Sequence, residues 1–577
     1  MDSNSESGII ALSRLGLTSG REAKFGGTPC DRLRGVMRIR LSALPMVLLF
    51  SGFVNVLHSA QPNGSAPPGA PHLEKRGAAT QLFVDGKPFL MLSGELHNSS
   101  SSSLDYMKPM WSKLAAMGLN SVVTPLSWEL VEPTEGGFDF TLVDGLLQQA
   151  RAQHQRIVFL WLASWKNGMS SYAPVWVKRD TRRFSRVIEN GAEVEILSPQ
   201  STAARQADAR AFAALMRHIK QVDAANHTVL MMQVENEVGV LGDSRDRSEA
   251  ANRAFASPVP EDLTSYLQAH RDTLYPDLRA LWEANGAKTA GTWAEVFGEN
   301  KRADEIFMAW HYARYIQAVA ASGKAAYDIP MYVNAWLAEG KAQPGDYPSG
   351  CPEPWVVDVW KAAGQALDFY APDLYAPNFV EWCRRYHRDG NPLYMPETRG
   401  GAAGAANVFY ALGEEAGLGF SPFGIDSELD DKGELASSYR VLAGLAPLVL
   451  EHQSAGDVHG FVLDKLSRSV DFNLGGYAVH VTLDEIFGHS AENGFGLVMA
   501  TGKDEFLGAG KGFRVSFKPL SPGEGQVGIA AVDEGSFEGG KWVPGRRLNG
   551  DENDQGKAWR FDGRQVKTEK VTLYRFE

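Results

Sequence analysis

The chain has 577 residues, of which 44% are hydrophobic and 22% are charged, and it carries a formal net charge of −12 at pH 7. This composition is typical of globular proteins and excludes disorder for most of the chain. The acidic balance argues against a nucleic-acid partner, because nucleic-acid binding needs concentrated Lys and Arg. Three cysteines exclude a four-cysteine zinc site and a disulfide-dense scaffold.

The first 60 residues contain one strongly apolar run, Leu41–Leu57, with Arg38 and Arg40 before it and the short segment His58–Ala60 after it. A basic start, an apolar core and a small residue at the end are typical of a secretory signal peptide. The pattern begins at Met37, which we take as the true start of the protein. We therefore expect a periplasmic or secreted protein that has no membrane contact after cleavage. A membrane anchor with a short cytoplasmic tail is the alternative, although the run is short for a span.

Residues 61–79 are predicted to form a linker, because residues 61–76 are rich in Pro, Gly, Ser and Ala. Export would also expose the cysteines to an oxidising compartment. Cys351 and Cys383 could then form a disulfide, and two separate buried thiols are the alternative.

Residues 80–455 alternate short apolar runs with longer helical patterns, which predicts a parallel sheet covered by helices. Eight such units match a (β/α)8 TIM barrel with long insertions. The expected strands are Phe89–Ser93, Ser121–Pro125, Ile157–Ala163, Val229–Val234, Met331–Asn334, Phe369–Pro372, Leu393–Pro396 and Gly419–Gly424. The clearest helical patterns are Leu104–Met117, Thr141–His154, Ala204–Ala224, Asp304–Ala326 and Glu434–His452.

Residues 456–577 are predicted to form a β-sandwich accessory domain, because Gly becomes more frequent and short alternating runs replace the helical pattern. Turn sequences such as SPGEG, FEGGK and LNGDEN separate these runs. The expected strands are Tyr477–Leu483, Gly496–Ala500, Phe513–Phe517, Gln526–Val532 and Val571–Phe576. We expect this domain to pack against the barrel and to contribute stability or glycan contact.

Two predicted strands end in glutamates. The fourth strand runs into the sequence QVENE, which contains Glu235 and Glu237, and the seventh runs into MPETR, which contains Glu397. Catalytic residues of α/β barrels lie at the carboxyl ends of the strands. A pair of carboxyl groups across one barrel mouth can serve as proton donor and nucleophile in glycoside hydrolysis. Glu235 is expected to be structural, because the side chain directly before Asn236 on a strand points the other way.

Several motifs resemble glycoside hydrolase family 35, the β-galactosidases of the barrel clan whose acid/base Glu lies on strand four and whose nucleophile lies on strand seven. The motifs are SGELH (residues 93–97), TPLSWELVEPTEGGFDF (124–140), VENEVG (234–239) and MPETRGG (395–401). The resemblance covers about residues 80–450, and a bacterial subgroup of the family carries a C-terminal β-sandwich. It implies a retaining β-galactosidase that removes terminal sugars from oligosaccharides.

The resemblance implies that Glu237 is the acid/base and Glu397 the nucleophile, with Asn236 bound to the sugar 2-hydroxyl. For retention, the carboxyl groups should lie about 5–5.5 Å apart, against about 6.5–9.5 Å for inversion. Burial and Glu397 should keep a proton on Glu237 near neutral pH, and Arg399 is a candidate donor to an ionised Glu397.

The resemblance also implies that Trp128 and Glu132 line the sugar subsite. His97, Trp336 and Tyr375 fall at strand ends. Each of these side chains could either pack in the core or contact the sugar. A Tyr near strand six or seven often bonds the nucleophile in this clan, which favours Tyr375. No motif requires a metal or an organic cofactor.

The chain departs from the family after strand three, where Ser164 replaces the Glu that reads the galactose hydroxyls. Lys166 and Asn167 could take over this recognition, or the preferred sugar could be a β-arabinopyranoside, β-fucoside or β-glucoside. A catalytically inactive barrel that binds glycans is a further alternative. The sequence leaves the oligomeric state open.

Overall fold

The computed structural model describes residues 69–577, apart from residue 487 and residues 522–524. The expected signal peptide, the alternative membrane anchor and the first part of the expected linker lie outside the described residues. Among the described residues, no helix is both long and apolar enough to cross a membrane.

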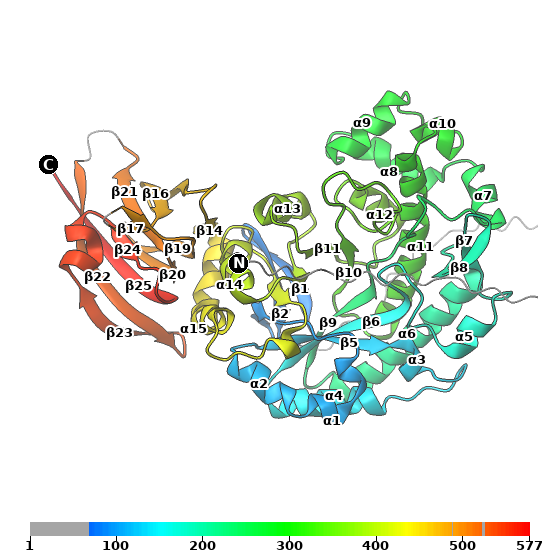
Figure 1. Ribbon diagram of the computed structural model, residues 1–577, viewed down its shortest axis with the longest axis horizontal. Helices are drawn as coiled ribbons and strands as arrows, with labels where there is room; N and C mark the ends of the chain where they lie inside the picture. The colour runs from blue at the N-terminus through cyan, green and yellow to red at the C-terminus, as the bar shows by residue number, and fades with distance from the viewer. Residues whose placement is uncertain (1–68, 487, 522–524) are drawn as a thin grey trace, which may run out of the picture. The chain divides into compact units, whose positions relative to one another are not determined.

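Eight parallel strands form the central sheet, and every predicted barrel strand is present (Figure 1). The order along the sheet is β4-β13-β12-β11-β10-β9-β6-β5. Glu95, just after β4, bridges both Val123 on β5 and Phe423 after β13, which closes the barrel. The strands are β4 (Met91–Leu92), β5 (Ser121–Ser127), β6 (Arg156–Lys166), β9 (Val229–Asn236), β10 (Met331–Trp336), β11 (Phe369–Leu374), β12 (Met395–Thr398) and β13 (Gly419–Pro422).

Helices surround the sheet because they alternate with strands in the sequence and bury one face against it. The first predicted helix is split in two, since Pro109 lacks the amide hydrogen needed to continue a helical ladder. Ser201 and Asn300 cap two long barrel helices by accepting from Ala204 N and Ala303 N. The helices at the predicted places are α1 (Leu104–Met107), α2 (Met110–Ala116), α4 (Thr141–Ala152), α6 (Thr202–Asp223), α11 (Lys301–Ala326) and α15 (Glu434–Ala455).

A small antiparallel sheet precedes the barrel, so the expected linker is wrong for its last residues. The strands β1 (His72–Arg76), β2 (Ala79–Val84) and β3 (Lys87–Pro88) pair in this order. Leu82 and Val84 of β2 pack against barrel residues such as Leu160 and Phe369. The last part of the expected linker therefore forms a strand in spite of its linker-like composition. Hydrogen bonds to the buried strand β2 satisfy the backbone N–H and C=O groups of β1.

Long insertions follow the third and fourth barrel strands. A hairpin of β7 (Arg186–Glu189) and β8 (Ala192–Leu197) follows β6, after the short helix α5 (Val175–Arg179). Four helices follow β9, namely α7 (Glu249–Phe255), α8 (Glu261–Ala269), α9 (Pro276–Ala284) and α10 (Trp293–Phe297). Insertions after barrel strands lie on the side of the mouth, where they can shape a site.

The residues after α15 form two large antiparallel sheets with a shared hydrophobic core, and a small ribbon of β17 (Glu485–Ile486) and β18 (His489–Ser490). One sheet has the order β14-β19-β20-β25-β22-β23 and the other the order β15-β16-β21-β24. Phe506 and Val571 from the first sheet pack with Phe513 and Trp559 from the second. The strands are β14 (Val458–Leu463), β15 (Ser469–Leu474), β16 (Tyr477–Leu483), β19 (Gly494–Gly502), β20 (Glu505–Lys511), β21 (Phe513–Pro519), β22 (Gln526–Glu538), β23 (Lys541–Leu548), β24 (Trp559–Phe561) and β25 (Lys567–Phe576).

This two-sheet region contacts the barrel through α14 (Gly401–Gly413). The rings of Phe409 and Phe495 lie 5.5 Å apart, and His459 bonds to Glu414 at 3.0 Å. A Cβ on Gly413 would lie 2.8 Å from the Cα of Gly460, so this close approach of two backbones requires glycine.

Cys351 and Cys383 are both buried free thiols, so the disulfide alternative is wrong and two separate thiols are present.

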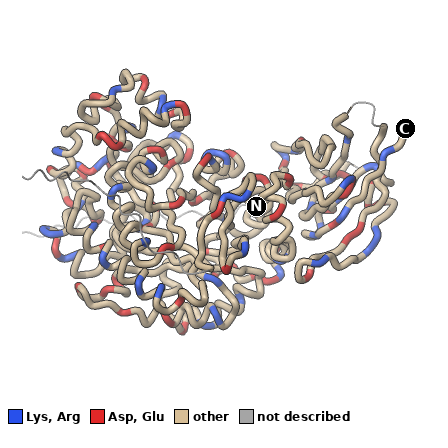
Figure 2. The backbone as a smooth tube through the Cα atoms, turned by 180° about the vertical axis from the view of Figure 1, so that it is seen from behind, with Lys and Arg blue, Asp and Glu red and all other residues tan. Residues whose placement is uncertain are grey.

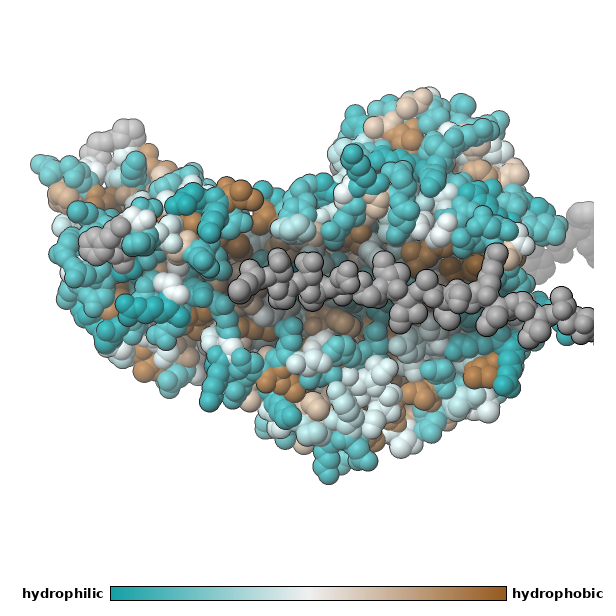
Figure 3. Space-filling model, in the orientation of Figure 1, coloured by the Kyte–Doolittle hydropathy of each residue, from teal (hydrophilic) through white to brown (hydrophobic). Residues whose placement is uncertain are grey.

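Lys and Arg alternate with Asp and Glu over the backbone in Figure 2. The face drawn in Figure 3 is mainly hydrophilic, with apolar residues gathered in small groups.

Candidate active site

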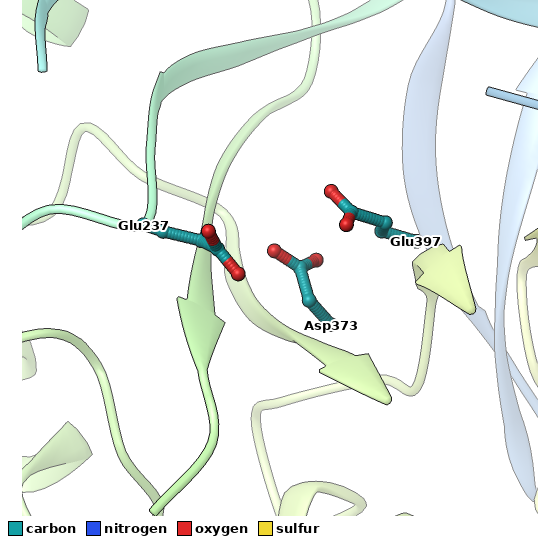
Figure 4. Close-up of side chains that lie close together, drawn as sticks. All are labelled: Glu237, Asp373 and Glu397. Atoms are coloured by element: carbon teal, nitrogen blue, oxygen red, sulfur yellow. The ribbon is translucent and has the colours of Figure 1, made fainter. Parts of the chain in front are cut away.

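Three carboxyl groups meet where the fourth, sixth and seventh barrel strands end. Glu237 follows β9, Asp373 lies in β11 and Glu397 lies in β12, and all three are buried. One carboxyl oxygen from each residue lies within 4.8 Å of one from each of the others. Figure 4 shows the three side chains pointing toward one another from separate strands. The structure thus brings together the two predicted glutamates and a third carboxyl group that the sequence analysis missed.

The backbone at the end of β9 departs from a regular strand. Glu235 and Glu237 have φ values of 66° and 46°, in the left-handed region that side chains rarely adopt. The amide of Glu237 donates to Asn334 Oδ1 at 2.9 Å, and Asn334 Nδ2 donates to Asp373 Oδ2 at 2.5 Å. Side-chain bonds from β10 and β11 therefore support a strained backbone that presents Glu237 to the mouth.

The surroundings of Glu237 favour the protonated form of its carboxyl group. Burial, together with the negative charge of Glu397, raises the pKa of Glu237 to about 7. Asn167 Nδ2 donates a hydrogen bond to Glu237 Oε2. A proton is therefore available on Glu237 at neutral pH, as a general acid requires.

Glu397 accepts a hydrogen bond from a phenol. Tyr375 OH donates to Glu397 Oε1 at 2.6 Å. Burial and the charge of Glu397 raise the pKa of Tyr375, so this phenol keeps its proton and remains a donor. Arg399 is exposed, and its Nε donates to the backbone oxygen of Tyr375 at 2.7 Å. The expected donor role of Arg399 toward Glu397 is therefore wrong, and Tyr375 fills it.

Lys166 is a buried cation among these carboxyl groups. Its Nζ donates to Asn236 Oδ1 at 2.9 Å, and the residue is 8% exposed. Burial alone favours the neutral amine, but the charges of Glu397 and Glu237 outweigh it and raise the pKa of Lys166. Since this ammonium already compensates negative charge, we interpret the carboxyl groups as a proton-transfer set and not as metal ligands.

The end of β6 is tied to β9 by buried polar contacts. Glu235 accepts from the backbone amides of Ser164 at 3.0 Å and Trp165 at 2.8 Å. Ser164 Oγ bonds to Asp208 and to Tyr315, both at 2.8 Å. Burial raises the pKa of both Glu235 and Asp208, which bond to each other. Ser164 and Glu235 thus have structural contacts, and the following residues, Lys166 and Asn167, face the site.

Two family models match parts of the chain. One, of glycoside hydrolase family 42 and described as "Beta-galactosidase", matches residues 102–304. The other, described as "Domain of unknown function", matches residues 435–560. The first region contains Lys166, Asn167 and Glu237. Because the matched model is that of family 42, the expected placement in family 35 is not confirmed.

Known proteins similar to this chain include β-galactosidases. One from Xanthomonas manihotis is 33% identical over 231 residues, which cover 38% of this chain and 33% of that protein. The chain therefore spans about a third of the length of this curated relative.

Solved structures give weaker likenesses. A β-galactosidase from Bacillus circulans has a TM-score of 0.42 and 14% identity over 63% of this chain and 57% of that one. The catalytic domain of a β-amylase from Paenibacillus polymyxa has a TM-score of 0.42 and 14% identity over 59% of this chain and 94% of that one.

Trp128 and Glu132 do not join the carboxyl cluster. Trp128 is fully buried, and its Nε1 donates to Glu132 Oε2 at 2.7 Å. Glu132 Oε1 accepts from the amide of Gly136 at 2.7 Å. Both carboxyl oxygens of Glu132 therefore accept hydrogen bonds from groups in the same turn. The contacts of this pair are thus local hydrogen bonds within a turn, and its expected place in the sugar subsite stays a prediction.

His97 and Trp336 lie at strand ends and remain accessible. His97 Nδ1 bonds to Asp426 Oδ1 at 3.0 Å, and its side chain is 45% exposed. Trp336, the last residue of β10, is 39% exposed and neighbours Asp373 in the strand register. Both side chains are therefore accessible to a bound sugar, and their expected role in sugar binding stays a prediction.

Sequence reasoning missed Glu95, Asn334 and Asp373. Glu95 is buried two residues before the predicted His97, and Asp373 lies two residues before the predicted Tyr375. Burial, followed by the charge of Glu397, raises the pKa of Glu95 well above its usual range. The two-residue period of a strand was the available signal, because alternate residues near a strand end share one face.

Proposed function

We propose that the protein is a retaining exo-glycosidase that hydrolyses terminal β-D-galactosyl residues of oligosaccharides. The observation that carries the proposal is the position of Glu237 beside Glu397, with carboxyl oxygens of the two within 4.8 Å of each other. The pKa of Glu237, raised to about 7 by burial and by Glu397, supports it. A retaining enzyme needs carboxyl groups about 5–5.5 Å apart, whereas an inverting enzyme needs about 6.5–9.5 Å to admit water. The short spacing supports direct attack on the sugar.

The proposed reaction has two displacements. Glu237 donates its proton to the glycosidic oxygen while Glu397 attacks the anomeric carbon, which releases the aglycone and forms a glycosyl ester. Glu237, now ionised, takes a proton from water, and the water oxygen attacks the same carbon and frees Glu397. Tyr375 orients Glu397, and Asn236, held by Lys166, is placed to bond the sugar 2-hydroxyl.

The choice of galactose rests on similarity. The family 42 match and the relative from Xanthomonas manihotis are both described as β-galactosidases, which favours galactose. The family 42 match favours family 42 over family 35 for this chain. Ser164, where a sugar-reading Glu was expected, supports the alternative of another β-glycoside. A panel of chromogenic β-glycosides tests this choice.

We expect the β-galactoside to give the highest kcat/KM in such a panel, above the β-glucoside, β-fucoside and β-arabinopyranoside. Galactose and glucose differ at the 4-hydroxyl, and a buried polar group left without its partner costs about 1–3 kcal/mol, or roughly ten- to a hundredfold in rate. Equal or faster turnover of the β-glucoside would leave the retaining mechanism but remove the galactosidase assignment.

Lys166→Ala is expected to lower kcat/KM for the β-galactoside at least about tenfold, because the variant leaves Asn236 without its partner and removes the buried cation. Asn167→Ala, which removes the donor to Glu237, should have a similar effect. Steady-state kinetics of both variants measure this, with the exposed Lys113→Ala as control. Wild-type kcat/KM in both site variants would show that sugar recognition lies elsewhere.

We further propose export by the segment that begins at Met37, and an accessory role for the two-sheet region from residue 456. The basic start and apolar run of residues 37–60 support the first proposal. The contacts of α14 with β14 and β19 support the second. Truncation near residue 456 should reduce solubility or polymer binding.

A further inference from the structure

A chain of two hydrogen bonds joins the backbone of Glu237 to the side chain of Asp373. The amide of Glu237 donates to Asn334 Oδ1, and Asn334 Nδ2 donates to Asp373 Oδ2. Carboxyl oxygens of Asp373 and Glu237 lie within 4.8 Å of each other, so a proton held between the two groups would close this chain of bonds into a ring. In Figure 4 the carboxyl group of Asp373 lies between those of Glu237 and Glu397. Asp373 therefore lies beside the carboxyl group of the proposed acid/base and is linked to its backbone through Asn334.

Two carboxyl groups can bond to each other only if one of them carries a proton. Asp373 Oδ2 accepts from Asn334, and Oδ1 is buried without a donor among the described residues. An ionised Asp373 would leave Oδ1 as a buried, charged oxygen without a donor, which is costly, whereas a protonated Oδ1 can donate to the neighbouring carboxyl group of Glu237.

The charges around Asp373 favour this protonated form. The residue is 3% exposed, and it faces three other carboxyl groups but one ammonium group. Burial, followed by the charges of Glu397 and Glu237, raises the pKa of Asp373 well above its usual range. The facing titratable groups are Glu95, Glu237, Glu397, Lys166 and the phenols of Tyr332, Tyr375 and Tyr386.

We propose that Asp373 is a neutral carboxylic acid that donates a hydrogen bond to Glu237 and stabilises the ionised form of this acid/base. Asp373 is a positioning residue, since it acts through Glu237, and the inference rests on the proposed glycosidase function. Burial and Glu397 make Glu237 a weak acid, and the bond from Asp373 offsets this effect. When Glu237 gives its proton to the leaving oxygen, the Asp373 proton stays in place and supports the new carboxylate.

The test compares two variants of nearly equal shape. Asp373→Asn keeps a donor toward Glu237 and an acceptor for Asn334. It should therefore leave the basic limb of the pH profile of kcat/KM nearly unchanged. Asp373→Leu removes the donor and should move that limb up by about one pH unit. Its kcat/KM should fall more for an alkyl β-galactoside than for a dinitrophenyl β-galactoside, which needs no acid.

The opposite result for Asp373→Asn would overturn the inference. If Asp373 were an anion, its neutralisation would remove a like charge beside Glu237 and move the basic limb down by about one pH unit. This comparison decides the question even if Asp373→Leu fails to fold. Failure of the proposed function would look different, because the wild type would then hydrolyse no β-glycoside of the panel.

A measurement of stability tests the protonation state of Asp373 without relying on enzyme activity. A neutral Asp373 holds its proton in the folded protein but loses it on unfolding above about pH 4. The Tm of the wild type should therefore fall relative to the Tm of Asp373→Asn as the pH rises from 5 to 7. A constant Tm difference over this range would mean that Asp373 is ionised in the folded state, and it would overturn the inference.

Discussion

Glu397→Ala is expected to lower kcat/KM for an aryl β-galactoside by at least about 10⁴-fold, because the variant has no nucleophile to form the glycosyl ester. Steady-state kinetics give this loss directly. Since Glu397 is buried and accepts from Tyr375, the melting temperature should be measured alongside activity. The exposed Glu451→Ala on α15 is the matched control and should keep wild-type kinetics.

The product formed with added azide distinguishes the nucleophile from the acid/base. In Glu397→Ala, azide can occupy the vacated space and attack the β-glycoside once, which gives an α-glycosyl azide. In Glu237→Ala, azide attacks the glycosyl ester on Glu397, which gives the β-azide by two displacements. A β-azide from Glu397→Ala would contradict the assignment of the two roles.

Glu237→Gln is expected to lower kcat/KM about 10²- to 10⁴-fold on substrates whose leaving group needs a proton. The wild-type profile should fall as the pH rises through about 7, because Glu237 loses its proton there. In the variant this basic limb should vanish, since the amide does not titrate. A retained basic limb near pH 7 on an ordinary aryl glycoside would assign the general acid to another group.

The same substitution should stabilise the folded protein at alkaline pH. Glu237 is protonated in the folded state up to about pH 7 but ionises on unfolding above its ordinary pKa of 4.5. The folded state therefore binds more protons between these values, and the wild type loses stability as the pH rises through this window. Glu237→Gln avoids a loss of about 3 kcal/mol at pH 8, which urea unfolding at pH 5 and pH 8 can measure. An unchanged difference between the two pH values would contradict the raised pKa.

The eight barrel strands were predictable because their signal is local. Each strand is a short apolar run, buried on both faces of the sheet, and helical patterns separate the runs. Exact ends were less predictable. The third strand extends to Lys166 and the fourth to Asn236, so polar residues that ended the apolar pattern still belong to the sheet.

The first part of the site followed from position alone. Parallel strands end at one edge of the barrel, so Glu237 and Glu397 could be placed at one mouth from their strand ends. The same reasoning did not predict the contacts of Trp128 and Glu132. Their motif lies near a strand end, but the side chains bond to each other and to the local turn.

Residue order was enough to predict the alternation of strands and helices, the change to an all-β region after α15 and the pairing of two glutamates. Which other groups surround these glutamates depends on packing in three dimensions. Asp373 and Lys166 come from different strands, and their contacts depend on left-handed backbone at Glu235 and Glu237 and on the bonds of Asn334. Local propensity does not encode these contacts, because a proton shared between two carboxyl groups exists only when folding buries both groups side by side.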